Sequence, residues 1–306
     1  MTLLSGEEPR PLDVSDVPLV FLCHNDRKFL PSLVSHYRRL GVTRFICVDD
    51  QSTDGSRDYL SAQPDVDLWV SPVRYKEARR GKLWREGLFA RYGSGRWYLN
   101  IDADEYLVYD DCFSRPIGEL IRHLETAGLK RLAAPMVDLY PGGAVNAFVF
   151  DGSDARMPWE IADHFDGSGY VVTYMKRFMS LAGGPRKRTF GAETELMKYP
   201  LMFWDDRCSF GVSIHQPTPF EENFGPIGGA LLHFKFFADY AEKTRDAVAD
   251  GQYFDGAREY QRILDAADEQ GGLDFTGPVS KHYEGPQQLL EEGFMAPLWT
   301  DGKSGS

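Results

Sequence analysis

The sequence predicts an α/β fold in which a mainly parallel sheet is flanked by helices. Three observations lead to this expectation. The first half of the chain alternates short apolar runs, typical of buried strands, with segments that repeat apolar residues at helical spacing. Such alternation builds parallel sheets with right-handed crossovers. Three of the strand-like runs also end in polar clusters, as expected where open α/β sheets bind ligands.

The expected elements of the first half follow from apolar periodicity. Residues 17–23 form an apolar run without charge, which predicts a buried strand. In residues 29–40 apolar side chains recur at helical spacing, and Gly41 can end that helix because glycine tolerates a left-handed backbone. The same criteria predict strands at 44–48, 66–70, 97–101 and 132–137 and helices at 55–60, 77–92 and 117–127.

The second half is less regular. Residues 140–226 are rich in Gly, Pro and aromatic residues, which predicts long loops of the kind that build substrate sites, with a short strand at 170–174. Residues 231–237 form a further apolar strand. Two helices are then expected, at 238–249 and 257–267.

One domain is expected, because no second segment has an apolar core of its own. The predicted organisation is a disordered tail at 1–16, the α/β domain at 17–237, a helical extension packed on it at 238–300, and a second disordered tail at 301–306. No apolar run approaches the ~20 residues of a membrane span. The first residues also lack the apolar stretch of a signal peptide.

Composition narrows the class of partner. The formal net charge of −12 argues against a nucleic-acid-binding protein. Four cysteines without paired spacing predict free thiols and a reducing, cytoplasmic location. Basic residues nevertheless cluster at 74–85 and 186–188. Such clusters on an acidic chain fit a small phosphorylated ligand, and ordinary solvated charge is the alternative.

Polar clusters follow three separate strand-like runs. Parallel strands bring their carboxyl ends to one edge of a sheet, so these clusters are expected to meet. Each cluster alone could be a turn or a helix cap, but three together favour a site. The clusters are His24-Asn25-Asp26, Asp49-Asp50 and Asp102-Ala103-Asp104-Glu105.

The third cluster suggests a metal ion. In an extended segment residues i and i+2 point to the same side, so Asp102 and Asp104 can converge. Two converging carboxylates repel each other unless a cation lies between them. Oxygen ligands suit Mg²⁺ or Mn²⁺.

Residues 48–55 (Val-Asp-Asp-Gln-Ser-Thr-Asp-Gly) resemble the Asp-Asp-x-Ser-Thr-Asp-Gly stretch of family 2 glycosyltransferases. Asp102-Ala103-Asp104 resembles the Asp-x-Asp metal motif of that family, and Asn25-Asp26 resembles its Asn-Glu pair, with Asp replacing Glu. Residues 231–236 (Leu-Leu-His-Phe-Lys-Phe) resemble a bacterial branch. The resemblance extends over about residues 17–260, and it implies a GT-A fold and a nucleotide-sugar donor.

The resemblance implies a metal-dependent glycosyltransferase. Such an enzyme would move a sugar, with inversion, from a nucleotide-diphosphate donor to a glycan or glycolipid acceptor in bacterial polysaccharide biosynthesis. A UDP-sugar is the expected donor. Contact with a membrane-borne acceptor would place the chain at the inner face of the membrane, although no amphipathic helix supports such contact.

The expected metal ligands are Asp102, Asp104 and His233. Strand alternation places His233 and Lys235 on one face of their segment, and GT-A enzymes commonly take a third ligand from a C-terminal histidine. A nitrogen ligand would favour Mn²⁺ over Mg²⁺. The competing histidines are His215 and His164.

Nucleotide contacts and the catalytic base complete the expected site. The base of an inverting transferase must reach the acceptor hydroxyl, and Asp138 at the end of a predicted strand is the first candidate. The alternatives are Asp166, Glu193 and Glu195, and Glu105 is expected to support the metal or to contact the acceptor. The expected nucleotide and phosphate contacts are His24, Asp26, Asp49, Asp50, Lys82, Asp102, Arg186, Arg188 and Lys235.

Two other functions share some of these features. A nucleotidyltransferase would normally carry a Gly-rich phosphate loop after its first strand, whereas residues 24–27 here are His-Asn-Asp-Arg. A lectin-like module with Ca²⁺ would need neither the Asp49-Asp50 pair nor the basic cluster at 186–188.

Overall fold

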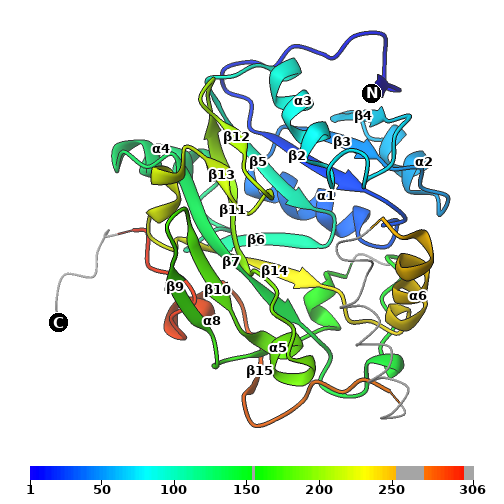
Figure 1. Ribbon diagram of the computed structural model, residues 1–306, viewed down its shortest axis with the longest axis vertical. Coiled ribbons are helices and arrows are strands. Elements are labelled where there is room, and N and C mark those ends of the chain that lie inside the picture. The colour runs from blue at the N-terminus through cyan, green and yellow to red at the C-terminus, as the bar shows by residue number, and fades with distance from the viewer. Residues whose placement is uncertain (154–155, 253–271, 300–306) are drawn as a thin grey trace.

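The computed structural model describes residues 1–153, 156–252 and 272–299. Its centre is a nine-stranded mixed sheet in the order β1-β4-β3-β2-β5-β11-β7-β14-β6 (Figure 1). Helices flank the sheet, so the predicted α/β class is confirmed. The strands are β1 (Thr2–Leu3), β2 (Pro18–Cys23), β3 (Arg44–Asp49), β4 (Val66–Val70), β5 (Arg96–Asp102), β6 (Glu105–Tyr109), β7 (Arg131–Leu139), β11 (Met197–Trp204) and β14 (Gly229–Phe234).

The parallel part of the sheet matches the expected pattern. Strand β2 pairs in parallel with β3 and β5, and β3 pairs in parallel with β4. The helices between these strands are α1 (Leu30–Leu40), α2 (Ser56–Ser61) and α3 (Lys82–Tyr92), and α4 (Ile117–Thr126) follows β6. Helix α3 begins five residues later than expected, because Arg79, Arg80 and Gly81 have left-handed backbone angles that no helix accommodates.

The other part of the sheet contains two strands that the sequence did not predict. Strand β11 lies inside the segment expected to be irregular and pairs antiparallel with both β5 and β7. Strand β6 follows β5 after only Ala103 and Asp104, crosses to the far edge and pairs antiparallel with β14. Pro200 and a lone Lys198 interrupt the apolar pattern of β11. Periodicity alone therefore did not reveal this strand.

Smaller elements surround the sheet. They are η1 (Val145–Ala147), η2 (Pro158–Glu160), β8 (His164–Asp166), β9 (Val171–Tyr174), β10 (Met179–Ala182), α5 (Gly184–Phe190), β12 (Ser209–Phe210), β13 (Pro217–Thr218), η3 (Phe220–Phe224), α6 (Tyr240–Asp250), β15 (Ser280–His282) and α8 (Pro286–Glu291). Strand β9 agrees with the expected short strand, and α6 agrees with the first of the two expected C-terminal helices.

The two ends of the chain differ from the expected organisation. Thr2 and Leu3 pair with β4, and Arg10 forms an ion pair with Asp67 at 2.9 Å, so the prediction of a disordered tail over 1–16 is wrong for these residues. The C-terminal extension is not purely helical, because β15 pairs with β8. The expected helix at 257–267 and the expected tail at 301–306 lie outside the described residues.

Both faces of the sheet are covered, which explains why its central strands are apolar throughout. Successive residues of β2 point to opposite faces. On one face Leu19 and Phe21 join a cluster with α1 and α4, and on the other face Val20 joins a cluster with Trp84 and Phe89 of α3. The alternation fixes the register of β2 at the centre of the sheet.

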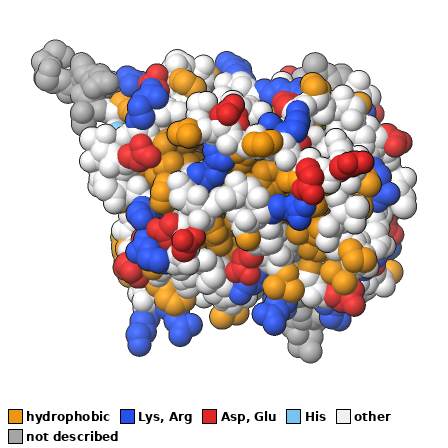
Figure 2. Space-filling view, turned by 90° about the horizontal axis from the view of Figure 1, so that it is seen from above, with side chains coloured by type: hydrophobic (Ala, Val, Ile, Leu, Met, Phe, Trp, Pro, Cys, Tyr) orange, Lys and Arg blue, Asp and Glu red, His pale blue; other side chains and the backbone are white. Residues whose placement is uncertain are grey.

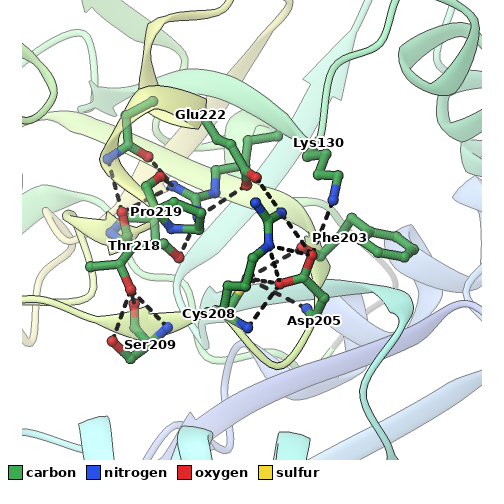
Figure 3. A network of polar contacts seen from close by, with 12 residues as sticks. Lys130, Phe203, Asp205, Cys208, Ser209, Thr218, Pro219 and Glu222 are labelled. Atoms are coloured by element: carbon green, nitrogen blue, oxygen red, sulfur yellow. Dashed lines mark hydrogen bonds and ion pairs between the residues drawn. The ribbon is translucent and has the colours of Figure 1, made fainter.

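A polar network holds the loop between β11 and η3, which carries His215 (Figure 3). Arg131 of β7 donates hydrogen bonds to the carbonyl oxygens of Pro217, Thr218 and Pro219 at 2.9, 2.6 and 3.0 Å. Asp205 accepts a hydrogen bond from Lys130 at 3.0 Å. These contacts attach the loop to β7, so its position follows that of the sheet.

The surface carries charges of both signs. In the view of Figure 2, Lys and Arg alternate with Asp and Glu, and hydrophobic side chains are dispersed among them. This face therefore offers no broad basic surface of the kind that binds nucleic acid. Among the described residues, no helix is long and apolar enough to cross a membrane.

Protonation of His36 is expected to make stability depend on pH. The side chain is 3% exposed, and its Nε2–H donates to the carbonyl of Leu107 at 2.8 Å. Burial lowers the pKa of His36 from 6.5 to about 4. Because the folded-state pKa lies below the unfolded one, its stabilising contribution is complete above pH 6.5 and is lost as the pH falls towards 4.

Between pH 7 and 5 this residue should cost on the order of 2 kcal/mol of unfolding free energy. Urea denaturation of the wild type and of His36→Gln, which keeps a hydrogen-bond donor, measures the effect. The wild type should lose more stability than the variant over this range. An equal loss in both proteins would contradict the assignment.

Candidate functional site

The carboxyl ends of β2, β3 and β5 meet at one edge of the sheet, and in Figure 1 β2 and β14 point towards α6 there. Two adjoining cavities open at this edge, with volumes of about 210 and 280 Å³. The smaller, which we call the β5 cavity, is lined in part by Asp50, Tyr75, Trp84, Asp102 and His233. The larger, the α6 cavity, is lined in part by Lys28, Phe29, Phe234, Tyr240 and Lys243. Both cavities are lined by His24, Asp26, Asp104, Lys235 and Asp250.

Asp102, the last residue of β5, is held by two buried cations. Its Oδ1 accepts a hydrogen bond from Arg85 at 2.5 Å, and its Oδ2 accepts one from Lys198 at 2.8 Å. Burial raises the pKa of Asp102, but attraction to Lys198 and Arg85 outweighs burial and brings the pKa well below its usual range. Asp102 is therefore ionised, and both of its oxygens already have cationic partners.

Glu105 lies beneath Asp102. Lys198 bridges the two carboxylates, and the backbone N–H of Asp102 donates to Glu105 Oε2 at 3.0 Å. Burial lowers the pKa of Lys198, but attraction to Asp102 and Glu105 outweighs burial and raises it. Glu105 is 1% exposed, which rules out the expected contact with an acceptor and leaves a supporting role.

Asp104 faces the opposite way, towards His233 of β14. Asp104 Oδ2 lies 3.4 Å from His233 Nε2, and His233 Nδ1 lies 2.6 Å from Oδ1 of Asp138. Burial lowers the pKa of His233, but attraction to Asp104 and Asp138 outweighs it and raises the pKa to about 9. The position between the two carboxylates thus favours positive charge.

The residues fit a metal ion only in part. Within the described part of the chain, no group of three His, Cys, Asp or Glu side chains is arranged to hold one. Asp104 and His233 face each other, and Asp138 would orient the imidazole as outer partners of metal ligands do. The prediction of Asp102 as a ligand does not fit, because Arg85 and Lys198 take its oxygens.

The two residues of the second polar cluster, Asp49 and Asp50, lie in different surroundings. Asp49 is fully buried and accepts hydrogen bonds from Arg57 at 2.5 and 3.0 Å, so it does not line either cavity. Asp50 lines the β5 cavity and accepts a hydrogen bond from Arg74 at 3.0 Å. The His24 ring donates to the Asp50 carbonyl at 2.5 Å, which joins the first cluster to the second.

Asp26 lies where the two cavities meet. Its Oδ2 accepts the backbone N–H of His24 at 2.9 Å. Burial raises the pKa of Asp26 to about 6, against the attraction of Lys243. Among the described residues no cation forms an ion pair with this carboxylate.

Besides Asp49, three more of the expected phosphate or nucleotide contacts do not line these cavities. Arg186 is paired with Asp138 at 2.8 and 3.1 Å. Arg188 forms two hydrogen bonds of 2.9 Å with Asp166. Lys82 donates to the carbonyl of Gly211 at 3.0 Å. Lys235 is the expected basic contact that lines both cavities.

The expected catalytic bases also lie apart from the cavities. Asp138 and Asp166 are each 1% exposed and engaged by arginines. Attraction to Arg186 outweighs burial and lowers the pKa of Asp138, so it is poorly suited to accept a proton. Glu193 is 74% exposed beside Lys187, and Glu195 accepts hydrogen bonds from Ser180 and the backbone of Leu181.

The two alternative histidines lie elsewhere. His215 donates to the carbonyl of Met197 at 3.0 Å, and burial together with Lys198 lowers its pKa to about 4. His164 of β8 pairs with Asp163 at 2.7 Å. Neither lines the two cavities, whereas His233 lines the β5 cavity.

Sequence reasoning missed Arg85 and Lys198 as parts of the site. Arg85 was one member of a basic cluster, and its complete burial is visible only once α3 packs on the sheet. Lys198 is a lone charge in the apolar run of β11, and that signal alone could have marked it.

Neither a family model nor a curated protein matches the chain. Similar solved structures include a crystal structure of 4-diphosphocytidyl-2C-methyl-D-erythritol synthase, 20% identical with a TM-score of 0.26, which covers 42% of this chain. The match spans 64% of the synthase chain. HddC from Yersinia pseudotuberculosis is 11% identical with a TM-score of 0.34, and the match covers 71% of this chain and 90% of HddC. Similarity at this level does not identify a function.

Replacement of Lys198 tests the buried cluster. Lys198→Met leaves Glu105 buried without its cation, and loss of one partner of a buried pair costs about 3–5 kcal/mol of unfolding free energy. The control Lys187→Met removes an exposed pair with Glu193 and should cost less than about 1 kcal/mol. Guanidinium denaturation measures both. An equal loss of unfolding free energy in the two variants would mean that the buried Lys198 pair stabilises the fold no more than an exposed pair does.

Proposed function

We propose that the chain transfers a sugar from a nucleotide-diphosphate donor to a hydroxyl acceptor, with inversion at the anomeric carbon. The observation that carries this proposal is the convergence of the polar ends of β2, β3 and β5 with His233 around two adjoining cavities. One cavity can take the donor while the other takes the acceptor.

The β5 cavity suits a nucleotide. Tyr75 and Trp84 line it with ring centroids 6.4 Å apart, and the Asp50 carboxylate lies beside them. Aromatic rings offer flat surface to a base, and a carboxylate accepts hydrogen bonds from a base or a ribose. A uridine nucleotide is the donor that we propose.

The charges of this cavity explain why a divalent cation would be required. Its lining includes five carboxylates, which would repel a diphosphate. The position that we propose for the cation is the Asp104–His233 pair, where the ion would replace the imidazole proton, and Mg²⁺ or Mn²⁺ commonly binds one or two protein ligands together with substrate phosphates. The five residues are Asp26, Asp50, Asp102, Asp104 and Asp250.

Bound there, the ion would act as a Lewis acid on the leaving diphosphate. The side chains contribute the remaining electrostatics. Lys235 lines both cavities and can donate to phosphate oxygens. Asp102 fixes the turn that carries Asp104, because Arg85 and Lys198 hold its carboxylate.

The acceptor that we propose is a glycan or glycolipid of a bacterial polysaccharide pathway. The α6 cavity adjoins the donor cavity at Asp26 and Asp104, so an acceptor hydroxyl there would lie next to the transferred sugar.

Substitution at the Asp104–His233 pair tests the metal and nucleotide site. Asp104→Asn should weaken UDP binding in the presence of Mn²⁺ by about 10–100-fold, because an amide cannot balance the ion's charge. Calorimetric titration with UDP, with and without Mn²⁺, measures the change. The control is Glu284→Gln, which changes an exposed residue and should bind UDP as the wild type does.

Product analysis distinguishes the reaction classes. Release of UDP from a UDP-sugar supports glycosyl transfer, and release of pyrophosphate from a nucleoside triphosphate and a sugar phosphate indicates a nucleotidyltransferase instead. Binding of free sugars without any nucleotide would point to a lectin-like module.

A further inference from the structure

The α6 cavity has the composition of a sugar site. Phe29, Phe234 and Tyr240 contribute aromatic surface, and the lining also contains both lysines and aspartates. Sugars combine apolar ring faces with many hydroxyl groups, so mixed surfaces of this kind match them. The volume of about 280 Å³ is near the lower end of ligand pockets, which span roughly 300–1,000 Å³.

The charges of this cavity favour a neutral ligand. Lys28 is held by both oxygens of Asp239 at 2.6 and 2.7 Å, and Lys243 donates to the carbonyl of Asn25. Four aspartates line the cavity against three lysines. The lining therefore provides no excess positive charge for an acceptor phosphate.

One carboxylate stands out at the boundary with the β5 cavity. The backbone of Asp26 is fixed, because its N–H donates to Ser56 Oγ at 3.2 Å and its carbonyl accepts from Phe29 at the start of α1. Its side chain accepts the backbone N–H of His24 at 2.9 Å and lines both cavities. A rigid backbone thus presents this carboxylate to both ligands.

The other carboxylates of the two cavities are less suited to receive a proton. Arg74 bridges Asp50 and Asp250, at 3.0 and 2.8 Å. Asp102 has two cationic partners and Asp104 faces His233. Asp246 lies on the exposed side of α6.

On the basis of the proposed function, we infer that the α6 cavity is the acceptor subsite, that it takes an uncharged sugar ring, and that Asp26 is the catalytic base. The acceptor oxygen forms a bond to the anomeric carbon as its O–H bond breaks, and the proton passes to the Asp26 carboxylate. The bond between that carbon and the diphosphate oxygen breaks, and its electron pair leaves with the diphosphate. With water as acceptor, the same step releases free sugar.

Hydrolysis of UDP-glucose, UDP-galactose and UDP-N-acetylglucosamine in the presence of Mn²⁺ tests the base without knowledge of the acceptor. Asp26→Asn should lower the rate of UDP release by about 10²–10⁴-fold and leave the dissociation constant of UDP nearly unchanged. Formate should restore part of the activity of Asp26→Ala, because it can replace the missing carboxylate. The matched control Asp58→Asn changes an exposed carboxylate of α2 that lines neither cavity, and it should hydrolyse as the wild type does.

The outcomes separate the alternatives. An unchanged rate in Asp26→Asn overturns the assignment of the base, and so does a large loss of UDP affinity without rescue by formate, which would make Asp26 a nucleotide contact. Asp26→Glu, which keeps a carboxylate, should retain more activity than Asp26→Asn if both variants unfold at the wild-type temperature. If the wild type releases UDP from none of the donors, the proposed function itself fails.

Ligand-observed NMR tests the subsite with methyl glycosides of glucose, galactose and N-acetylglucosamine in the presence of UDP and Mn²⁺. Saturation transfer should be seen in the wild type and lost in Asp246→Trp, which fills the cavity from its exposed side. Equal transfer in that variant would place the sugar elsewhere. Stronger binding of glucose 6-phosphate than of the neutral glycosides would overturn the uncharged class.

Discussion

The site depends on a cluster of ionised side chains that the fold buries beneath the sheet edge. Arg85 is fully buried, and Lys198 and Glu105 are 5% and 1% exposed. Charges in such positions are tolerated only when each has a partner at hydrogen-bond distance, since the cost of desolvation is large. The partners come from α3, β5, β6 and β11, so the cluster requires these four elements to keep their relative positions.

This requirement determines which groups remain for chemistry. The carboxylate of Asp102 is paired with Arg85 and Lys198. The carboxylate of Asp138 is paired with Arg186 and His233. Asp104 lies between the two networks, and His233 is its nearest charged partner. The carboxylates at the ends of the strands thus divide into those that hold the framework and those that face the cavities.

The sequence predicted the parallel part of the fold well, because helical and strand periodicity are local properties. It did not reveal β11, whose pairing joins residues about a hundred positions apart, for example Leu201 with Leu99. The convergence of the polar clusters was expected from the position of each strand end. The roles of single residues within the site could not be predicted. Arg186, which neutralises Asp138, lies 48 residues away in the sequence, and no residue next to Asp138 indicates this pairing.

The two sides of the β5 cavity differ in how firmly they are held. On the sheet side, buried ion pairs fix Asp102 and the turn to Asp104. On the α6 side, Arg74 donates to Asp250 at 2.8 Å and the backbone of Lys76 donates to Gln252 at 3.1 Å, and both contacts are exposed. Exposed polar contacts contribute little free energy, so the end of α6 is held less firmly than the sheet edge, whereas its start is anchored by buried Tyr240. A donor that needs space in this cavity would therefore displace Asp250 and Gln252 at the end of α6 more readily than Asp102 and Asp104.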